Sequence, residues 1–188
     1  FFTCTAFFAV GATEPGNPID DGGFEADDAI GTSSPWGKNP AYPGDFQIIS
    51  DKSQAHSGER FLRVQVPGDI RDPRTGVGIC FNQKFPRTAG KYRVQFFCRG
   101  KAEVLCALST FGNTKWISSQ PSKWFSVTDP SGWELYEGVI DVPESLESLT
   151  THEKELVDTL QFNIYVRPED QGATDTAVDI DDVVLTEN

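Results

Sequence analysis

The sequence contains no methionine, only two histidines and no long uninterrupted run of hydrophobic residues. A helix that spans a membrane needs about 18 consecutive apolar residues, so no membrane-spanning segment is predicted. Basic residues are also scarce, with 16 Lys and Arg against 28 Asp and Glu and a formal net charge of −12. Because nucleic acids and anionic membranes attract clustered positive charge, we expect neither as a partner.

Aromatic residues make up 12% of the chain, and 17 glycines and 12 prolines interrupt it. This composition favours many short strands joined by turns. Alternating apolar and polar residues between Gly or Pro predict strands at Phe46–Ser50, Arg60–Val66, Gly76–Phe85, Gly90–Arg99, Ala102–Phe111, Trp133–Val142, Thr159–Val166 and Ala177–Leu185. One short helix is expected at Pro143–Asp158, where Glu and Leu alternate. We therefore predict an all-β sandwich of two antiparallel sheets with at most one short helix.

The four cysteines lack the paired C-x-x-C spacing of a zinc site, so a zinc centre is disfavoured. Outside the cytoplasm they could form disulfides, with three possible pairings. The strands Gly90–Arg99 and Ala102–Phe111 predict a hairpin with Cys98 and Cys106 on inward faces. A disulfide and two buried free thiols are equally consistent with this placement.

The first ten residues, FFTCTAFFAV, alternate with a period of two. One apolar face is formed by Phe2, Cys4, Ala6, Phe8 and Val10. We predict an ordered strand rather than the remnant of a signal peptide, because no Lys or Arg precedes Lys38. The predicted organisation is an apolar strand at 1–12, a turn-rich connector at 13–23 and a sandwich domain at 24–188.

Several motifs, in order, resemble the carbohydrate-binding modules of families 4, 9, 16 and 22. They are DGGFE (Asp21–Glu25), SGERFLRV (Ser57–Val64), GKYRVQF (Gly90–Phe96), GWELY (Gly132–Tyr136) with Val142-Pro143, and VDIDDVVL (Val178–Leu185). The resemblance covers about residues 17–188. It implies a jelly-roll β-sandwich in a secreted protein.

The same resemblance implies a structural calcium ion that ties the first and last strands together. Its ligands would be side-chain oxygens of Glu25, Asp181 and Asp182 and the backbone of Ser57. Calcium takes six to eight oxygen ligands, which suits carboxylates joined by carbonyls from turns. The alternative is that Asp181 and Asp182 are exposed charges on a terminal strand. Adjacent acids beside an apolar strand repel each other without a cation, which favours the ion.

A glycan site requires exposed aromatic rings with polar groups nearby. Trp116 and Trp124, with Phe125 next to the latter, lie in a polar, Ser-rich segment and are the expected ligand-binding residues. The other two tryptophans, Trp36 and Trp133, are expected in the core.

No catalytic residue is predicted. The aspartates of Val178–Val184 do not have the spacing of a glycosidase carboxylate pair. Neither His56 nor His152 lies in a recognisable nucleophile motif. We therefore expect that the protein is not an enzyme.

Two functions are consistent with these features. The N-terminal strand could leave its own domain and complete the sheet of a neighbouring copy, which would build a homo-oligomeric filament or surface layer. Cys4 could then be cross-linked to the next subunit. The alternative is a calcium-stabilised module that recognises a polysaccharide. Either protein would be secreted, extracellular or attached to the cell surface.

Overall fold

The computed structural model describes residues 16–26, 35–39, 41–42, 44–66, 76–113, 115–145, 157–169 and 176–188. The strand predicted at residues 1–12, with Cys4, lies outside these ranges, as does most of the helix predicted at Pro143–Asp158. All regular elements of the described residues are strands. None of them belongs to a helix that could cross a membrane.

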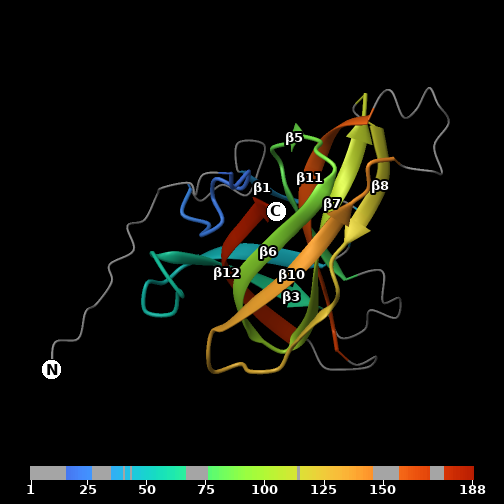
Figure 1. The fold of residues 1–188 in the computed structure, drawn as a ribbon. Coiled ribbons are helices and arrows are strands. Elements are labelled where there is room, and N and C mark those ends of the chain that lie inside the picture. Colours follow the sequence, from blue (N-terminus) through green and yellow to red (C-terminus); the bar gives the residue numbers. More distant parts are fainter. Residues whose placement is uncertain are drawn as a thin grey trace, which may run out of the picture.

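The described strands form two antiparallel sheets packed face to face (Figure 1). The five-stranded sheet has the order β10 (Glu134–Val142), β6 (Gly90–Gly100), β12 (Thr176–Glu187), β3 (Arg60–Val66), β2 (Asp45–Ser50). The seven-stranded sheet has the order β1 (Trp36–Lys38), β4 (Val77–Phe81), β11 (Val157–Arg167), β7 (Ala102–Gly112), β8 (Lys115–Pro121). Two short strands join its path, with β5 (Phe85–Pro86) beside β11 and β9 (Phe125–Val127) beside β7. The predicted all-β sandwich is confirmed.

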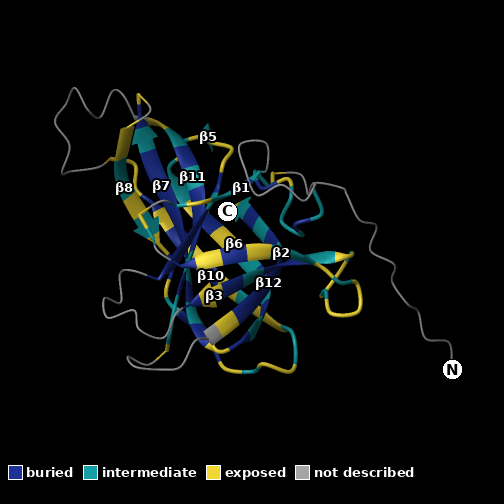
Figure 2. Ribbon diagram, turned by 180° about the vertical axis from the view of Figure 1, so that it is seen from behind, coloured by how far each residue is buried: buried dark blue, intermediate teal, exposed yellow. Residues whose placement is uncertain are grey.

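The core lies between the two sheets, and alternation along each strand creates it (Figure 2). On β11, for example, Phe162 and Ile164 are buried while their neighbours face outward. Trp36 is fully buried and packs against Phe24 and Phe81 at ring-centroid distances of 5.0 and 5.1 Å. Its predicted place in the core is confirmed.

The hairpin predicted from β6 and β7 is wrong, because the two strands belong to different sheets. Gly100 makes the crossing possible, with a φ of 133° that favours glycine. A Cβ there would lie 2.5 Å from the carbonyl oxygen of Ala177. Cys98 and Cys106 are consequently buried on the inner faces of opposite sheets, and both are free thiols.

Candidate functional site

A bulge in β12 places two acidic side chains on the outer side of the five-stranded sheet. The pairing of β12 with β6 shifts between Asp181 and Val184, and Asp182 has a φ of 49°. The extra residue lets Ile180 and Val183 both face the core, while the two carboxylates remain on the outside of the sheet.

The predicted metal ligands meet at this bulge. A Cβ on Gly23 would lie 3.5 Å from Asp182 Oδ1, 4.0 Å from Asp181 Oδ1 and 3.7 Å from Glu25 Cγ. A side chain at position 23 would therefore make ordinary van der Waals contacts with Asp181 and Asp182, beside the methylene of Glu25. Ser57 joins them, because its hydroxyl donates to Asp182 Oδ1 at 2.7 Å.

Backbone N–H groups already partner the carboxylates. Asp181 Oδ2 accepts from the amides of His56 and Ser57 at 2.9 and 3.3 Å. Glu25 Oε1 accepts from the amides of Glu59 and Arg60 at 2.8 and 3.0 Å. Asp181 and Asp182 thus hold the loop before β3 against the bulge in β12, and Glu25 ties the N-terminal loop to the start of β3.

Burial and a neighbouring carboxylate disfavour the charged form of Asp181, while Asp182 itself lies 2.6 Å from His56 Nδ1. The burial of Asp181, and next the charge of Asp182, raise the pKa of Asp181 from 3.8 to about 7, even though three backbone amides stabilise the anion. Burial also raises the pKa of Asp21, whose Oδ2 is buried with no hydrogen-bond partner. Among the described residues, His, Cys, Asp and Glu side chains nowhere form a cluster of three that could hold a metal by itself. A cation at the bulge would therefore need backbone oxygens as well.

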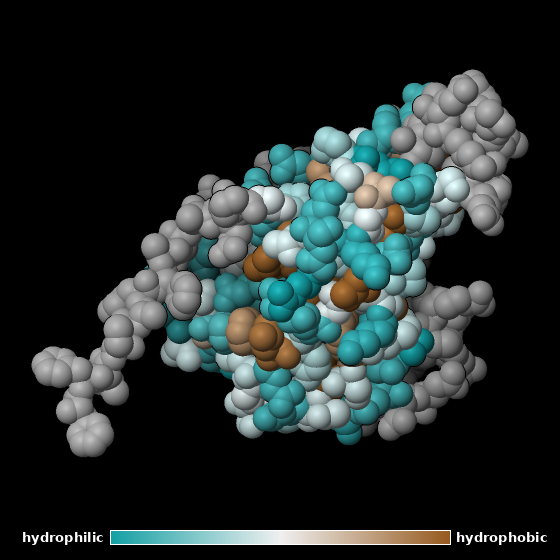
Figure 3. All heavy atoms as spheres, in the orientation of Figure 1, coloured by the Kyte–Doolittle hydropathy of each residue, from teal (hydrophilic) through white to brown (hydrophobic). Residues whose placement is uncertain are grey.

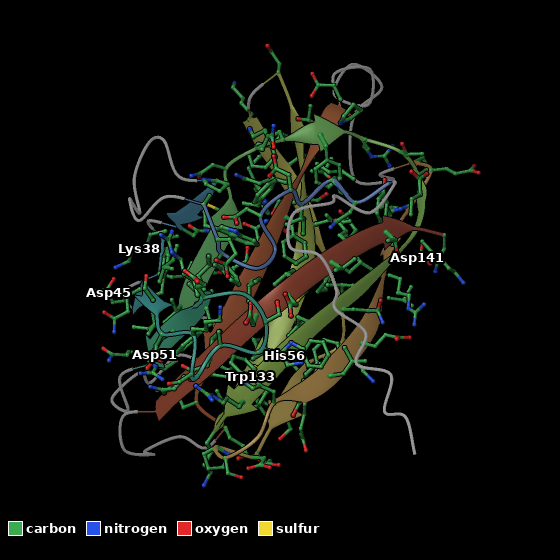
Figure 4. All side chains as sticks on the ribbon, turned by 90° about the vertical axis from the view of Figure 1, so that its left-hand side faces the viewer. Lys38, Asp45, Asp51, His56, Trp133 and Asp141 are labelled. Atoms are coloured by element: carbon green, nitrogen blue, oxygen red, sulfur yellow. The ribbon has the colours of Figure 1, made fainter. Side chains whose placement is uncertain are left out.

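The loop between β2 and β3 covers the bulge and part of the outer face of the five-stranded sheet. His56 stacks on Phe97 with ring centroids 3.5 Å apart, and its centroid lies 6.0 Å from that of Trp133. Figure 4 shows His56 and Trp133 next to each other. Trp133 Nε1 donates to the carbonyl of Gln54 at 3.0 Å. Trp133 is half-buried on the outer face of the sheet, so its predicted place in the core is corrected. The rest of that face is mainly hydrophilic, with separate hydrophobic spots (Figure 3).

A groove of about 770 Å³ lies over the outer face of the seven-stranded sheet. Its aromatic lining comes from Tyr42, Phe111, Trp116, Trp124 and Tyr165. The rings of Tyr42 and Tyr165 are 5.1 Å apart and tilted by 53°. Burial raises the pKa of Tyr165 to about 12, so its hydroxyl remains a neutral donor at physiological pH. Rings from several strands thus share one open cavity.

Neutral polar groups lie between these rings. Asn163 Nδ2 donates to the hydroxyl of Ser109 at 3.0 Å, and that hydroxyl lies 2.7 Å from the hydroxyl of Ser119. Gln161, which also lines the groove, donates to the carbonyl of Phe81 at 3.0 Å. Because β11 alternates, its inward side chains fill the core and its outward amides line the groove.

The predicted ligand-binding aromatics divide between groove and core. Trp116 is 62% exposed and, like Trp124, lines the groove. Phe125 is 4% exposed and packs against Phe96 at 5.4 Å, so its predicted role in ligand binding is corrected. The physical reason is that Phe125 begins β9 with its side chain towards the core, whereas Trp124 precedes the strand.

Tyr42 and Tyr165 were missed by the sequence analysis. The polar positions of β11, occupied by Gln161, Asn163 and Tyr165, were a usable signal because they alternate with an apolar face. Tyr42 lies outside the regular strands, where no periodicity marks its direction.

Solved structures share this architecture. The structure of TmCBM61 in complex with beta-1,4-galactotriose is 20% identical, with a TM-score of 0.54 over 92% of this chain and 99% of that one. The chain has the jelly-roll fold of carbohydrate-binding modules. The CBM22-1 xylan-binding domain from Paenibacillus barcinonensis Xyn10C is 12% identical, with a TM-score of 0.54 over 94% of this chain and 97% of that domain.

The same jelly roll also occurs within a longer enzyme. Arabinose-bound MgGH51 α-L-arabinofuranosidase is 12% identical, with a TM-score of 0.59 over 91% of this chain but 26% of the enzyme. No protein-family model matches the sequence, and no curated protein matches it. At these identities the likeness shows the fold of the jelly roll.

Proposed function

We propose that this jelly roll is a secreted, non-catalytic module that binds a polysaccharide in the groove of its seven-stranded sheet. The observation that carries the proposal is the groove lining, in which the rings of Tyr42, Trp116, Trp124 and Tyr165 surround neutral amides and hydroxyls. Aromatic faces stack on the C–H faces of sugar rings, and amides and hydroxyls bind the sugar hydroxyls.

The groove chemistry favours binding over hydrolysis. Glycoside hydrolysis uses two carboxylates about 5 to 9.5 Å apart. Among the described residues that line the groove there is neither Asp nor Glu. The fold is also that of modules which, in the neighbours named above, bind β-1,4-galactotriose or xylan.

Affinity electrophoresis through gels that contain soluble xylan, galactan or mixed-linkage glucan tests the proposal. Trp124→Ala and Tyr165→Ala should each weaken retardation about tenfold in Kd, because a buried stacking ring is a typical hot spot. Trp133→Ala is the matched control, since that ring lies on the other sheet. The proposal would be contradicted if both groove variants were retarded as strongly as the native protein. It would also be contradicted if no gel retarded the native protein.

We also propose that a calcium ion binds at the β12 bulge, held by Glu25, Asp181, Asp182 and the backbone of Ser57. Support comes from the adjacent carboxylates of Asp181 and Asp182, to which Ser57 is hydrogen-bonded, and from the raised pKa of Asp181. A bound cation would neutralise these acids and tie β12 to the loop before β3. Calcium should raise the melting temperature and a chelator should lower it, since a ligand of the folded state stabilises that state. A melting temperature that responds to neither would refute the site.

Self-assembly through Phe1–Val10 stays a second proposal. Its support is the uncharged, alternating sequence of that segment, which could pair with a sheet edge of a second copy. Size exclusion of the full chain and of a variant without residues 1–12 tests it. If both are monomeric at every concentration, the donor-strand hypothesis is wrong.

A further inference from the structure

Charge is distributed unevenly between the groove and the rest of the molecule. The chain carries 28 Asp and Glu residues, yet Arg167 is the single charged side chain among the described residues that line the groove. A second cation, the exposed Lys84, lies 3.5 Å from the centroid of the Phe111 ring, which also lines the groove. The described lining of the groove therefore carries no carboxylate in an acidic protein, and its one guanidinium is paired with Glu103 from outside the lining.

Arg167 is held in a fixed position at the groove wall. Its guanidinium carbon lies 3.8 Å from the centroid of the Trp124 ring, and its Nε donates to Glu103 Oε2 at 2.6 Å. Because one contact involves the plane of the guanidinium and the other involves Nε, both leave the two Nη groups unused. Within the described part of the chain, these Nη groups have no acceptor.

A guanidinium with free Nη groups is matched to a planar or tetrahedral oxyanion, which it binds through two parallel hydrogen bonds. A neutral sugar hydroxyl cannot accept both of these parallel hydrogen bonds in the same geometry, so it binds a guanidinium less strongly. Glu103 does not line the groove; it pairs with Nε of Arg167 and offsets part of its charge, while the Nη donors stay available to a ligand.

The overall charge of −12 does not prevent such binding. At physiological ionic strength, charges more than about 8 Å apart are largely screened in solvent. Contacts near the groove then decide the preference: no carboxylate of the described residues lines the groove, and Glu103, which offsets part of the Arg167 charge at 2.6 Å, leaves the Nη donors of Arg167 for a ligand.

We propose that the groove prefers polysaccharides with acidic substituents, either carboxylate or sulfate, and that Arg167 determines this preference. The inference rests on the proposed polysaccharide-binding function and adds the chemical class of the ligand to it. Trp124 would stack on a sugar ring while the neighbouring Arg167 binds the anionic group of that ring or of a branch.

Matched oligosaccharide pairs test the inference by calorimetry. One pair is xylohexaose with its glucuronate-substituted form, and another is a galactan oligosaccharide with its sulfated form. The acidic member of at least one pair should bind about tenfold more tightly, as expected for a charge-assisted contact. Which pair shows the difference identifies carboxylate or sulfate as the group recognised. Added sodium chloride should weaken binding of the acidic member and leave binding of the neutral member unchanged.

Arg167→Gln should reduce the acidic-to-neutral affinity ratio towards one. The ratio is the decisive readout, because a variant that merely disturbs Trp124 would weaken both members equally. Arg93→Gln is the matched control, since Arg93 is also paired with a glutamate, Glu137, but lies on the other sheet.

The inference is overturned if the neutral members bind as tightly as the acidic ones, or if Arg167→Gln leaves the ratio intact. In that case polysaccharide binding still stands, provided that Trp124→Ala weakens it. Absence of binding to every member of every pair would overturn both proposals.

Discussion

Removing the charge of Asp181 should change how stability depends on pH when calcium is absent. Asp181 is fully buried, and its pKa is raised from 3.8 to about 7. Between about pH 4 and pH 7 the folded chain therefore keeps a proton on this carboxyl that the unfolded chain releases. The stability that the protonated Asp181 carboxyl contributes is fully present below pH 4 and is lost as the pH rises through 7. At about 1.36 kcal/mol per pH unit, the loss is about 4 kcal/mol.

The assay is urea unfolding between pH 4 and pH 8 in the presence of a chelator, for the native chain and for Asp181→Asn. The native chain should lose about 4 kcal/mol relative to the variant across this range. With excess calcium the difference should disappear or reverse, because a bound cation stabilises the ionised carboxylate.

Asp51→Asn provides the control. Hydrogen bonds from Ser53 and Gln54 lower the pKa of Asp51, so its titration lies below the range of the assay. The unfolding free energy of this variant should depend on pH in the same way as that of the native chain from pH 5 to pH 8. If the unfolding free energy of Asp181→Asn also follows that of the native chain across this range, the fold does not hold Asp181 protonated, and the raised pKa at the bulge is refuted.

Further predictions concern packing and accessibility. Gly22→Ala should destabilise by about 2 to 4 kcal/mol in urea unfolding, because its Cβ would lie 1.9 Å from the carbonyl oxygen of Val183, whereas Gly132→Ala should have little effect. Equal stability of these two variants would contradict the close packing of the N-terminal loop on β12. Phe125→Ala should cost about 3 to 5 kcal/mol, as expected for a core aromatic; a loss below about 1 kcal/mol would show that this ring is not in the core. Of the three described thiols, Cys80 alone should react with iodoacetamide in the native protein, and peptide mass spectrometry that finds the two core cysteines labelled as fast would disprove their burial.

Strand alternation made much of the fold predictable. Arg60–Val66 was predicted with the bounds that β3 has, because one face of that strand is apolar throughout. β8 was missed, since WISSQ has no apolar period and the strand is an exposed edge of its sheet. The path from β6 to β7 was predicted wrongly because a short turn between two amphipathic strands suits a hairpin and a crossing between sheets equally well.

The candidate sites were partly predictable for similar reasons. Ser57 and Asp182, both predicted around calcium, are hydrogen-bonded although they lie far apart in the sequence, and the calcium ion itself stays a prediction. For the groove, Trp124 and Phe125 could not be told apart from their polar surroundings, because the strand direction that separates them depends on the pairing of β9 with β7. No feature of the sequence marked Arg167 as a groove residue, since its contact with Trp124 depends on tertiary structure.

The central position of β12 has a consequence for biosynthesis. This strand spans Thr176–Glu187, yet it separates β6 from β3 in the middle of the five-stranded sheet. While a ribosome is still translating the preceding residues, β6 and β3 each lack a neighbour and expose unpaired backbone groups. Domains dominated by such distant pairings fold slowly and present aggregation-prone edges during synthesis. A nascent chain stalled before residue 176 should therefore remain bound to chaperones, and release of the last strand should trigger folding of the sandwich.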